Sequence, residues 1–359
     1  MPAEVEKART LANHIRFTGD RPAEDMDRVS ASSDSTWRQP FYEALEVGPE
    51  LTPQLAAEMK SVCRTLALPP SAVTAFVISS SEAQAACRTI SDNLCHVYLA
   101  SSLIELLNPK ELRFVVGHEI GHFLFRHRGG RAREGGYGLE DFVGMRRQEL
   151  SVDRVGLLAC GSLDVAIRTI IKTISGLGDQ HLRFDASAFI NQIRKARRSG
   201  GVAGESSTHP SLIVRARALM WFSMVWDGSA DVYGLPRDEV ERIDRKIEQD
   251  LSTYVDGNLT ERAAEVLDDF KLWCILDRIC KRGRLSDAER QIVEAQFDSK
   301  VKESVERFFR DNLQYRIEER IDTSWHHTRS EVLRQFPQTG QDKLERIERD
   351  VDDLFAKGD

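Results

Sequence analysis

The sequence predicts an α+β protein that is mostly helical, with a small sheet, and that continues into a helical C-terminal region. Three observations lead to this class. Residues 72–79 are apolar and β-branched and residues 94–100 alternate apolar with polar, which is typical of strands. Residues 108–128 have the start signal and the apolar content of a buried helix. Beyond residue 236 the chain is highly charged and keeps helical spacing of its apolar residues.

The 359 residues are long enough for one large domain with additional segments. Residues 1–46 are predicted to be a polar N-terminal arm that docks loosely at most. Residues 47–228 are predicted to form the main globular domain, and residues 229–359 a helical charged region of unknown role.

Composition narrows the class of protein further. Apolar residues make up 41% of the chain, enough for a core, and the net charge of −7 argues against nucleic acid as a partner. No stretch has the roughly 18 apolar residues of a membrane-spanning helix. The N-terminus lacks a signal peptide pattern, and the six cysteines form no CxxC pair. We therefore expect a soluble, cytoplasmic protein with reduced thiols.

Several helices and strands are predicted over residues 47–226. Thr52 and Pro53 are a typical helix start, and this helix is expected to run to about Leu66. The two predicted strands follow. The further helices are expected at about 140–160, 186–198 and 210–226.

The helix that opens at Asn108 has a near-ideal start. Asn108 is at the cap position, Pro109 at the first helical position and Glu111 at the third. This helix is expected to run through about Arg128, where Gly129 ends it.

The C-terminal region has its own helical signals. Residues 286–289 read as a capping box. The apolar residues that keep near-helical spacing on one face are Val293, Phe297, Val301, Val305, Phe308 and Ile317.

The central chemical signal is His118-Glu119-Ile-Gly-His122. Two histidines four residues apart on a helix project from the same face, so both imidazoles can reach one tetrahedral zinc ion. Glu119 lies beside that face and is free to act as general base toward a metal-activated water, whose pKa zinc lowers to about 7. The spacing predicts one zinc ion per chain and hydrolytic chemistry.

A third ligand is needed, and two residues compete for this role. Glu149 is the better candidate, because Asp153 shares its face one turn later and could accept a hydrogen bond from a ligand histidine. His127 is the rival, although its position favours a histidine near the last carbonyls of the helix. On spacing alone, Glu149 and Asp153 could also be a solvated acidic pair.

Three motifs together resemble a known family. They are the stretch from Asn108 to His122, the ExxxD pattern from Glu149 to Asp153, and Thr208-His209-Pro210 with Arg215 six residues after His209. The combination, over about residues 47–226, resembles the HtpX-like zinc peptidases of the forty-eighth metallopeptidase family, which includes the CAAX prenyl endopeptidases.

The resemblance implies a zincin-like domain and a gluzincin-type site, in which a carboxylate is the third ligand. By this resemblance the metal ligands would be His118, His122 and Glu149, and Glu119 would be the general base. Asp153 would be the hydrogen-bonding partner of a ligand histidine. His209 would donate to the oxyanion, and Arg215 would support the site from nearby. It also gives residues 94–100 the role of an edge strand that pairs with an extended substrate, although an ordinary core strand explains them equally well.

The sequence departs from the family in three respects. Family members usually have membrane spans, and none is found here. The segment between His122 and Glu149 is short. Gln84-Ala85 stands where the family often has Asn-Ala, which leaves that substrate contact open.

The function expected from these residues is a zinc-dependent endopeptidase acting on proteins or peptides. Two alternatives remain open: a short-gap HExxH peptidase that cleaves a repressor-type protein, and a non-catalytic zinc-binding interaction protein. For residues 229–359, binding of a protein partner and formation of an oligomer are both open.

Overall fold

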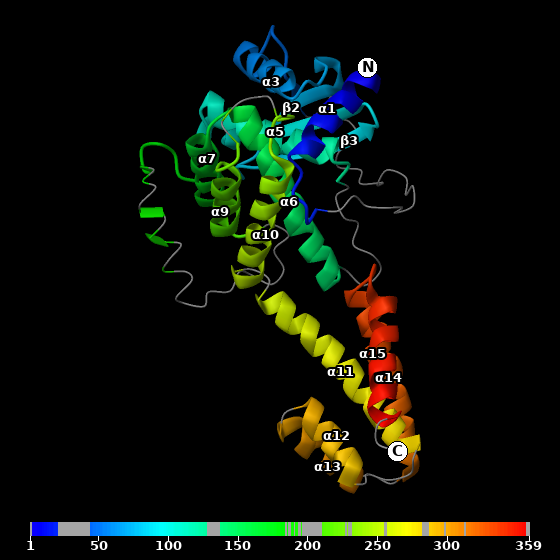
Figure 1. Cartoon of the computed structure of the whole chain (residues 1–359). Coiled ribbons are helices and arrows are strands. Elements are labelled where there is room, and N and C mark those ends of the chain that lie inside the picture. The colour runs from blue at the N-terminus through cyan, green and yellow to red at the C-terminus, as the bar shows by residue number, and fades with distance from the viewer. Residues whose placement is uncertain are drawn as a thin grey trace. The chain divides into compact units, whose positions relative to one another are not determined.

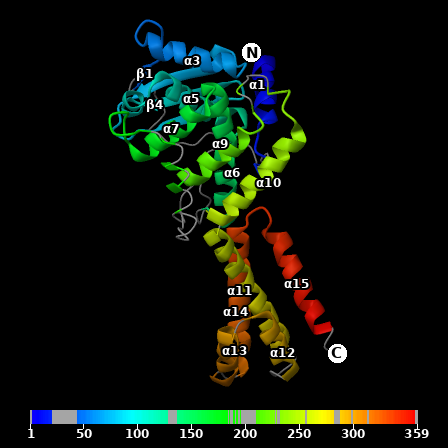
Figure 2. The same cartoon turned by 60° about the vertical axis from the view of Figure 1, so that its left-hand side comes forward.

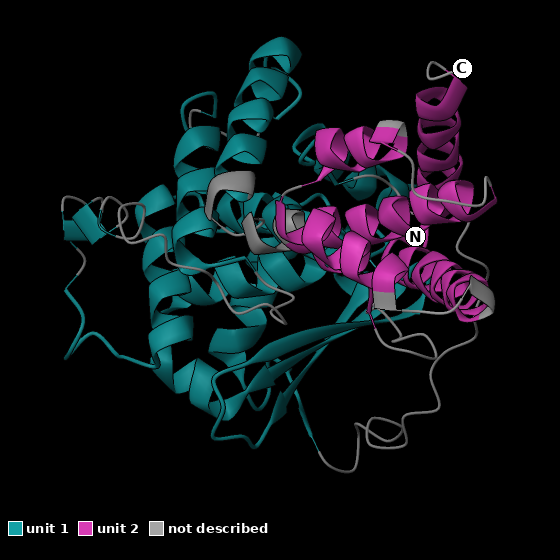
Figure 3. Cartoon of the chain, turned by 90° about the horizontal axis from the view of Figure 1, so that it is seen from below, with its two compact units in different colours: residues 1–130, 144–256 teal, residues 131–143, 257–359 magenta. Residues whose placement is uncertain are grey.

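The computed structural model describes two compact units, which Figure 3 colours separately. The first comprises residues 1–130 and 144–256, and the second residues 131–143 and 257–359. The residues described are 2–20, 44–127, 137–183, 185, 188–189, 191–192, 195, 210–226, 228, 232–254, 257–281, 287–297, 299–311 and 314–356. The predicted helix at 186–198 lies largely outside them, and the predicted domain boundaries stay predictions.

The first unit contains a four-stranded sheet with the order β1-β2-β4-β3. Its strands are β1 Leu45–Glu46, β2 Val73–Ile78, β3 Ala85–Ser91 and β4 Leu94–Ala100. Strand β4 runs parallel to β2 and antiparallel to β3, while β1 pairs antiparallel with β2.

The expectation that residues 94–100 form an edge strand is wrong, because β4 has a partner on each side. The sheet edge next to it is β3, which precedes β4 in a hairpin. The Ala-Ala-Cys-Arg sequence that opens β3 has little β-branched character, so the strand gives a weak sequence signal.

The helices of the first unit lie beside this sheet (Figures 1 and 2). They are α1 Pro2–His14, α3 Pro53–Thr65, α4 Ser101–Leu106, α5 Pro109–Leu124, α6 Leu139–Cys160, α7 Leu163–Ser175, α9 Leu212–Phe222 and α10 Arg237–Tyr254, with a 3-10 turn, η2, at Pro70–Ala72. Helices α6, α9 and α10 extend away from the sheet in Figures 1 and 2. Helix α5 contacts α1, α3, α7 and strands β3 and β4, so it is the central helix of this unit. Helix α9 packs against both α7 and α10.

One buried cluster joins the sheet to these helices. The strand residues Val97 and Leu99 are fully buried in it, as are Val62 of α3 and Val116 and Ile120 of α5. Burial of such side chains stabilises the fold by about 1.5–3 kcal/mol each. The cluster fixes α5 against the sheet, and the HExxH motif on α5 is fixed with it.

The N-terminal residues differ from the expected loose arm. Residues 2–14 form α1, and its apolar face is buried in the same cluster. Val5, Ala8, Leu11 and Ala12 recur at helical spacing, a short amphipathic pattern that the polar composition of residues 1–46 conceals.

The second unit is helical. Its helices are α11 Gly257–Lys281, α12 Asp287–Gln296, α13 Ser299–Asp311, α14 Gln314–Gln335 and α15 Gly340–Ala356. Helices α11, α14 and α15 pack against one another, and α12 packs against α13. Of the six spaced apolar residues predicted to share a face, three belong to the buried core cluster of this unit and three are partly buried and pack against it. The buried ones are Val293, Val305 and Ile317, and the partly buried ones are Phe297, Val301 and Phe308.

The predicted fold class is confirmed: the chain is mostly helical, has one small sheet and continues into a helical C-terminal region. Among the described residues, none of the helices combines the length and the apolar character needed to cross a membrane.

Candidate active site

Helix α5 carries the HExxH motif, and its start is fixed as the sequence predicts. The Asn108 side chain accepts hydrogen bonds from the backbone N–H groups of Lys110 and Glu111, and the Glu111 carboxylate accepts one from the N–H of Asn108. Helix α5 ends at Leu124, a little before the expected end. The rings of His118 and His122 lie 5.2 Å apart between centroids, on one side of the helix.

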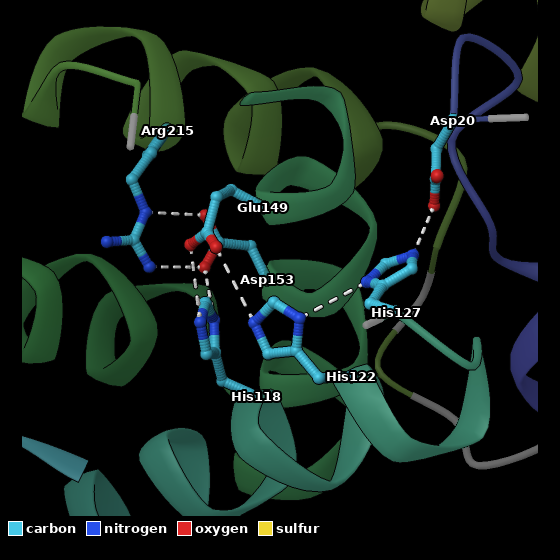
Figure 4. A network of polar contacts seen from close by, with 7 residues as sticks. All are labelled: Asp20, His118, His122, His127, Glu149, Asp153 and Arg215. Carbon is cyan, nitrogen blue, oxygen red and sulfur yellow. Dashed lines mark hydrogen bonds and ion pairs between the residues drawn. The ribbon is translucent and has the colours of Figure 1, made fainter. Parts of the chain in front are cut away.

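Helix α6 places Glu149 opposite the two histidines (Figure 4). The Oε2 atom of Glu149 is 3.4 Å from Nε2 of His118, and its Oε1 atom is 3.5 Å from Nε2 of His122. One nitrogen or oxygen from each of the three residues lies within 4.8 Å of the others. His118 and Glu149 are buried, and His122 is half-buried. In the described part of the chain, this is the one group with metal-ligand geometry.

Glycines allow α5 and α6 to approach this closely. A Cβ atom on Gly117 would lie 2.5 Å from Cβ of Ala159, and one on Gly156 would lie 2.7 Å from the carbonyl oxygen of Phe114. These contacts are shorter than side chains tolerate, so both positions require glycine for packing. The close crossing of the helices brings the Glu149 carboxylate to the histidines.

The Gly156→Ala variant is therefore expected to separate the helices. The added methyl group cannot fit against the Phe114 backbone, so we expect a loss of about 1–3 kcal/mol of stability in denaturant unfolding and weaker zinc binding. Gly144→Ala, in the same helix, is the matched control. No atom lies within 4 Å of a Cβ there, so alanine should be neutral or stabilise by up to about 1 kcal/mol. Equal stability of the two variants would contradict this account of the crossing.

Asp153 contacts the Nδ1 atom of His118, the ring nitrogen that does not face Glu149. Its Oδ1 atom is 3.0 Å from Nδ1 of His118, and Arg215 of α9 binds the carboxylate with two nitrogens, at 2.8 and 2.6 Å. Burial opposes ionisation of Asp153, but the charges and hydrogen bonds of Arg215 and His118 together outweigh it and lower the pKa of this carboxyl. Asp153 is thus a charged acceptor for the Nδ1–H of His118, which leaves Nε2 facing Glu149.

The surroundings of His118 strongly favour positive charge. Burial by itself would lower the pKa of the imidazole, but Asp153 and Glu149 together raise it to about 10. The same two carboxylates would stabilise a divalent cation between the histidines.

Glu119 is half-buried on α5, the helix that packs against β3. A hydrogen bond with Cys95, burial and the negative charges of Cys95 and Glu119 raise the pKa of Cys87 on β3 well above its ordinary value. The charge of Glu119 therefore acts on a residue of the strand at the sheet edge.

His127 is not part of the His–His–Glu group, and its side chain has other partners than helix carbonyls. Arg126 adopts a left-handed conformation with φ of 57°, and the N–H of His127 donates to the carbonyl of His122 at 2.8 Å. This end motif turns the chain back over the last turn of α5. Nδ1 of His127 then lies 3.2 Å from Nδ1 of His122, and its Nε2 lies 3.0 Å from Oδ2 of Asp20.

Asp20 is a residue of this network that the sequence did not reveal. It is 107 positions from His127 and lies in a polar segment without a motif. Burial opposes its ionisation, but His127 and Arg16 outweigh burial and lower the pKa of its carboxyl.

His209 lies outside the described residues, which resume at Pro210, so its role as an oxyanion donor stays a prediction. Arg215 is brought to the site through Asp153, as described above.

The HExxH motif on α5 and the His–His–Glu group together are the arrangement that is typical of HExxH metallopeptidases. Residues 49–145 match the model of peptidase family M48, and this match confirms the family resemblance that the sequence motifs indicate. Peptidases of this family are zinc metallopeptidases. The matched segment contains His118, Glu119 and His122 and ends just before Glu149. No curated protein and no solved structure matches the chain.

Proposed function

We propose that this chain is a zinc-dependent endopeptidase with His118, His122 and Glu149 as metal ligands and Glu119 as general base. The observation that carries the proposal is the convergence of the Nε2 atoms of both histidines on the two oxygens of one carboxylate, 3.4 and 3.5 Å away. A helix built only for packing has no need of this arrangement in a buried place.

The donor set suits zinc in a catalytic rather than a structural site. Two imidazoles and one carboxylate are typical of zinc peptidases, and three protein ligands leave a fourth position for water or substrate. When bound, zinc would supply a water of lowered pKa and a Lewis acid for the scissile carbonyl.

Residues of the chain would then carry out proton transfer, orientation of the metal ligands and stabilisation of the oxyanion. Glu119 takes the proton of the attacking water and passes it to the leaving amine. Asp153, held by Arg215, keeps the proton of His118 on Nδ1, so that Nε2 stays available as a ligand. His209 is proposed as a donor to the developing oxyanion, on the strength of the family motif alone.

We further propose that an extended substrate pairs with β3. This strand ends the sheet in the described part of the chain, and α5 packs against it. A segment added at this edge would gain backbone hydrogen bonds that do not depend on its sequence. It would also run beside the strand that packs against α5, the helix that carries Glu119.

Removal of the metal tests the proposal. A chelator is expected to abolish hydrolysis of an unfolded protein substrate, and stoichiometric Zn²⁺ is expected to restore it, because both the water and the carbonyl need the cation. Metal content and product release are measured on the same samples.

Two results would count against an endopeptidase. Zinc binding without hydrolysis would favour the non-catalytic, zinc-binding interaction protein. Hydrolysis that survives complete removal of the metal would exclude a metallopeptidase mechanism.

A further inference from the structure

The two candidate histidine ligands are held in different ways. Nδ1 of His118 contacts the carboxylate of Asp153 directly, at 3.0 Å. Nδ1 of His122 contacts a second imidazole, His127, whose far nitrogen reaches the carboxylate of Asp20 (Figure 4). Each histidine is therefore linked through its Nδ1 atom to a buried carboxylate. For His118 the link is direct, whereas for His122 the imidazole of His127 lies between the ring and the carboxylate.

We propose that Asp20 and His127 are positioning residues of the metal centre, which form a hydrogen-bonded relay that holds His122 with its Nε2 atom toward Glu149. This inference rests on the proposed zinc site at His118, His122 and Glu149. Neither residue belongs to the His–His–Glu group that would hold the metal.

The distances allow one consistent set of protons for neutral rings. A ligand Nε2 on His122 must be unprotonated, so its Nδ1 carries the hydrogen and donates it to Nδ1 of His127. The proton of His127 is then on Nε2, where it donates to Oδ2 of Asp20 at 3.0 Å. Each atom in the relay thus has a fixed role as donor or acceptor.

The relay is shielded from water. The side chain of His127 is 3% exposed and that of Asp20 is 1% exposed. Arg16 binds the same carboxylate through Nε and Nη2, at 3.0 and 3.2 Å, and so supplies a positive charge for it. Hydrogen bonds are stronger in such a buried place, and their loss leaves polar atoms unsatisfied.

The turn that carries Asp20 is hydrogen-bonded to helices α6 and α10. The N–H of Phe17 donates to Ser151 of α6 at 3.1 Å, and the N–H of Thr18 donates to Asp244 of α10 at 2.8 Å. Arg154 of α6 forms a buried ion pair with the same Asp244.

The backbone at the other end of the relay is also specialised. Arg126 holds a left-handed conformation that is unfavourable for a residue with a side chain, and this turn directs His127 back onto His122. The inference gives the N-terminal segment a function at the site, because it supplies the terminal acid.

Zinc affinity is the direct test. Asp20→Ala and His127→Ala, each in the full chain, are expected to weaken Zn²⁺ binding by about 10–100-fold in competition with a chelator. Two matched controls are expected to keep wild-type affinity. Asp250→Ala removes another acid that binds an arginine through two contacts, and His14→Ala removes a histidine of the N-terminal segment outside the relay.

A conservative variant and a spectrum separate positioning from a general loss of structure. Asp20→Asn keeps an acceptor oxygen for His127, so it should bind zinc more tightly than Asp20→Ala. Nitrogen-15 NMR of the wild-type zinc form should show the hydrogen of His122 on Nδ1 and that of His127 on Nε2. The opposite proton position on His127 would overturn the relay.

The outcomes for the relay and for the proposed function differ. A wild-type chain that binds no zinc refutes the zinc site itself. A wild-type chain that binds zinc, with relay variants and controls of equal affinity, refutes the relay and leaves the proposed function intact.

Discussion

Replacement of Glu119 by glutamine is expected to lower the rate of peptide hydrolysis by about 10²–10⁴-fold while the protein keeps its zinc. The amide has nearly the shape of the carboxylate but cannot accept a proton at neutral pH. Because Glu119 is outside the His118, His122 and Glu149 group, its replacement should leave the metal ligands in place. The measurement is kcat on an unfolded protein substrate, with zinc content determined on the same preparation.

A matched control is available on the neighbouring helix α4. Glu105 is exposed, so Glu105→Gln changes the net charge equally without affecting the site. Wild-type activity of the Glu119→Gln variant would refute the general base. Loss of zinc from this variant would instead make Glu119 part of the metal site.

The elements that the sequence predicts well are those with local causes. Helix α5 starts at the position that Asn108, Pro109 and Glu111 predict, because a capping box involves only residues within one turn. The face shared by His118 and His122 follows from helical periodicity alone. Strand β4 has the predicted bounds, and the signal for it is local, because apolar residues alternate with His96 and Tyr98 at its centre.

The elements that the sequence does not predict depend on distant contacts. Which strand forms the sheet edge is decided by pairing between separate segments, and alternation within β4 cannot reveal it. Asp20 contacts His127 from a turn whose backbone N–H groups donate to Ser151 and Asp244, two residues far away in the sequence. No spacing rule connects these positions.

The glycines of the motif region have a meaning that spacing also leaves hidden. Gly117 precedes the first histidine, and Gly121 precedes the second. Each lies where α5 meets α6, and a side chain at either position would press on α6. The two helices can therefore present their ligands to one point only if these positions remain small.

The largest effect on metal binding is expected from Glu149→Ala. Its two oxygens are the atoms on which the Nε2 atoms of His118 and His122 converge, so the variant loses a direct ligand and not only a supporting contact. The loss of zinc affinity should therefore exceed the roughly 100-fold upper range for a supporting residue. Chelator competition measures it.

Two further variants belong to the same experiment: Glu149→Gln tests the role of the negative charge, and Gln148→Ala is the control. Glutamine fills the same space without the negative charge, so Glu149→Gln should also bind zinc poorly if charge and donor strength matter at this position. Gln148→Ala alters the preceding residue of α6 and should bind like the wild type. Because a lost ligand outweighs a lost support, the affinities should fall in the order wild type, then Asp20→Ala and His127→Ala, then Glu149→Ala. If the Glu149→Ala protein binds zinc more tightly than the His127→Ala protein, the third ligand is His127 and not Glu149.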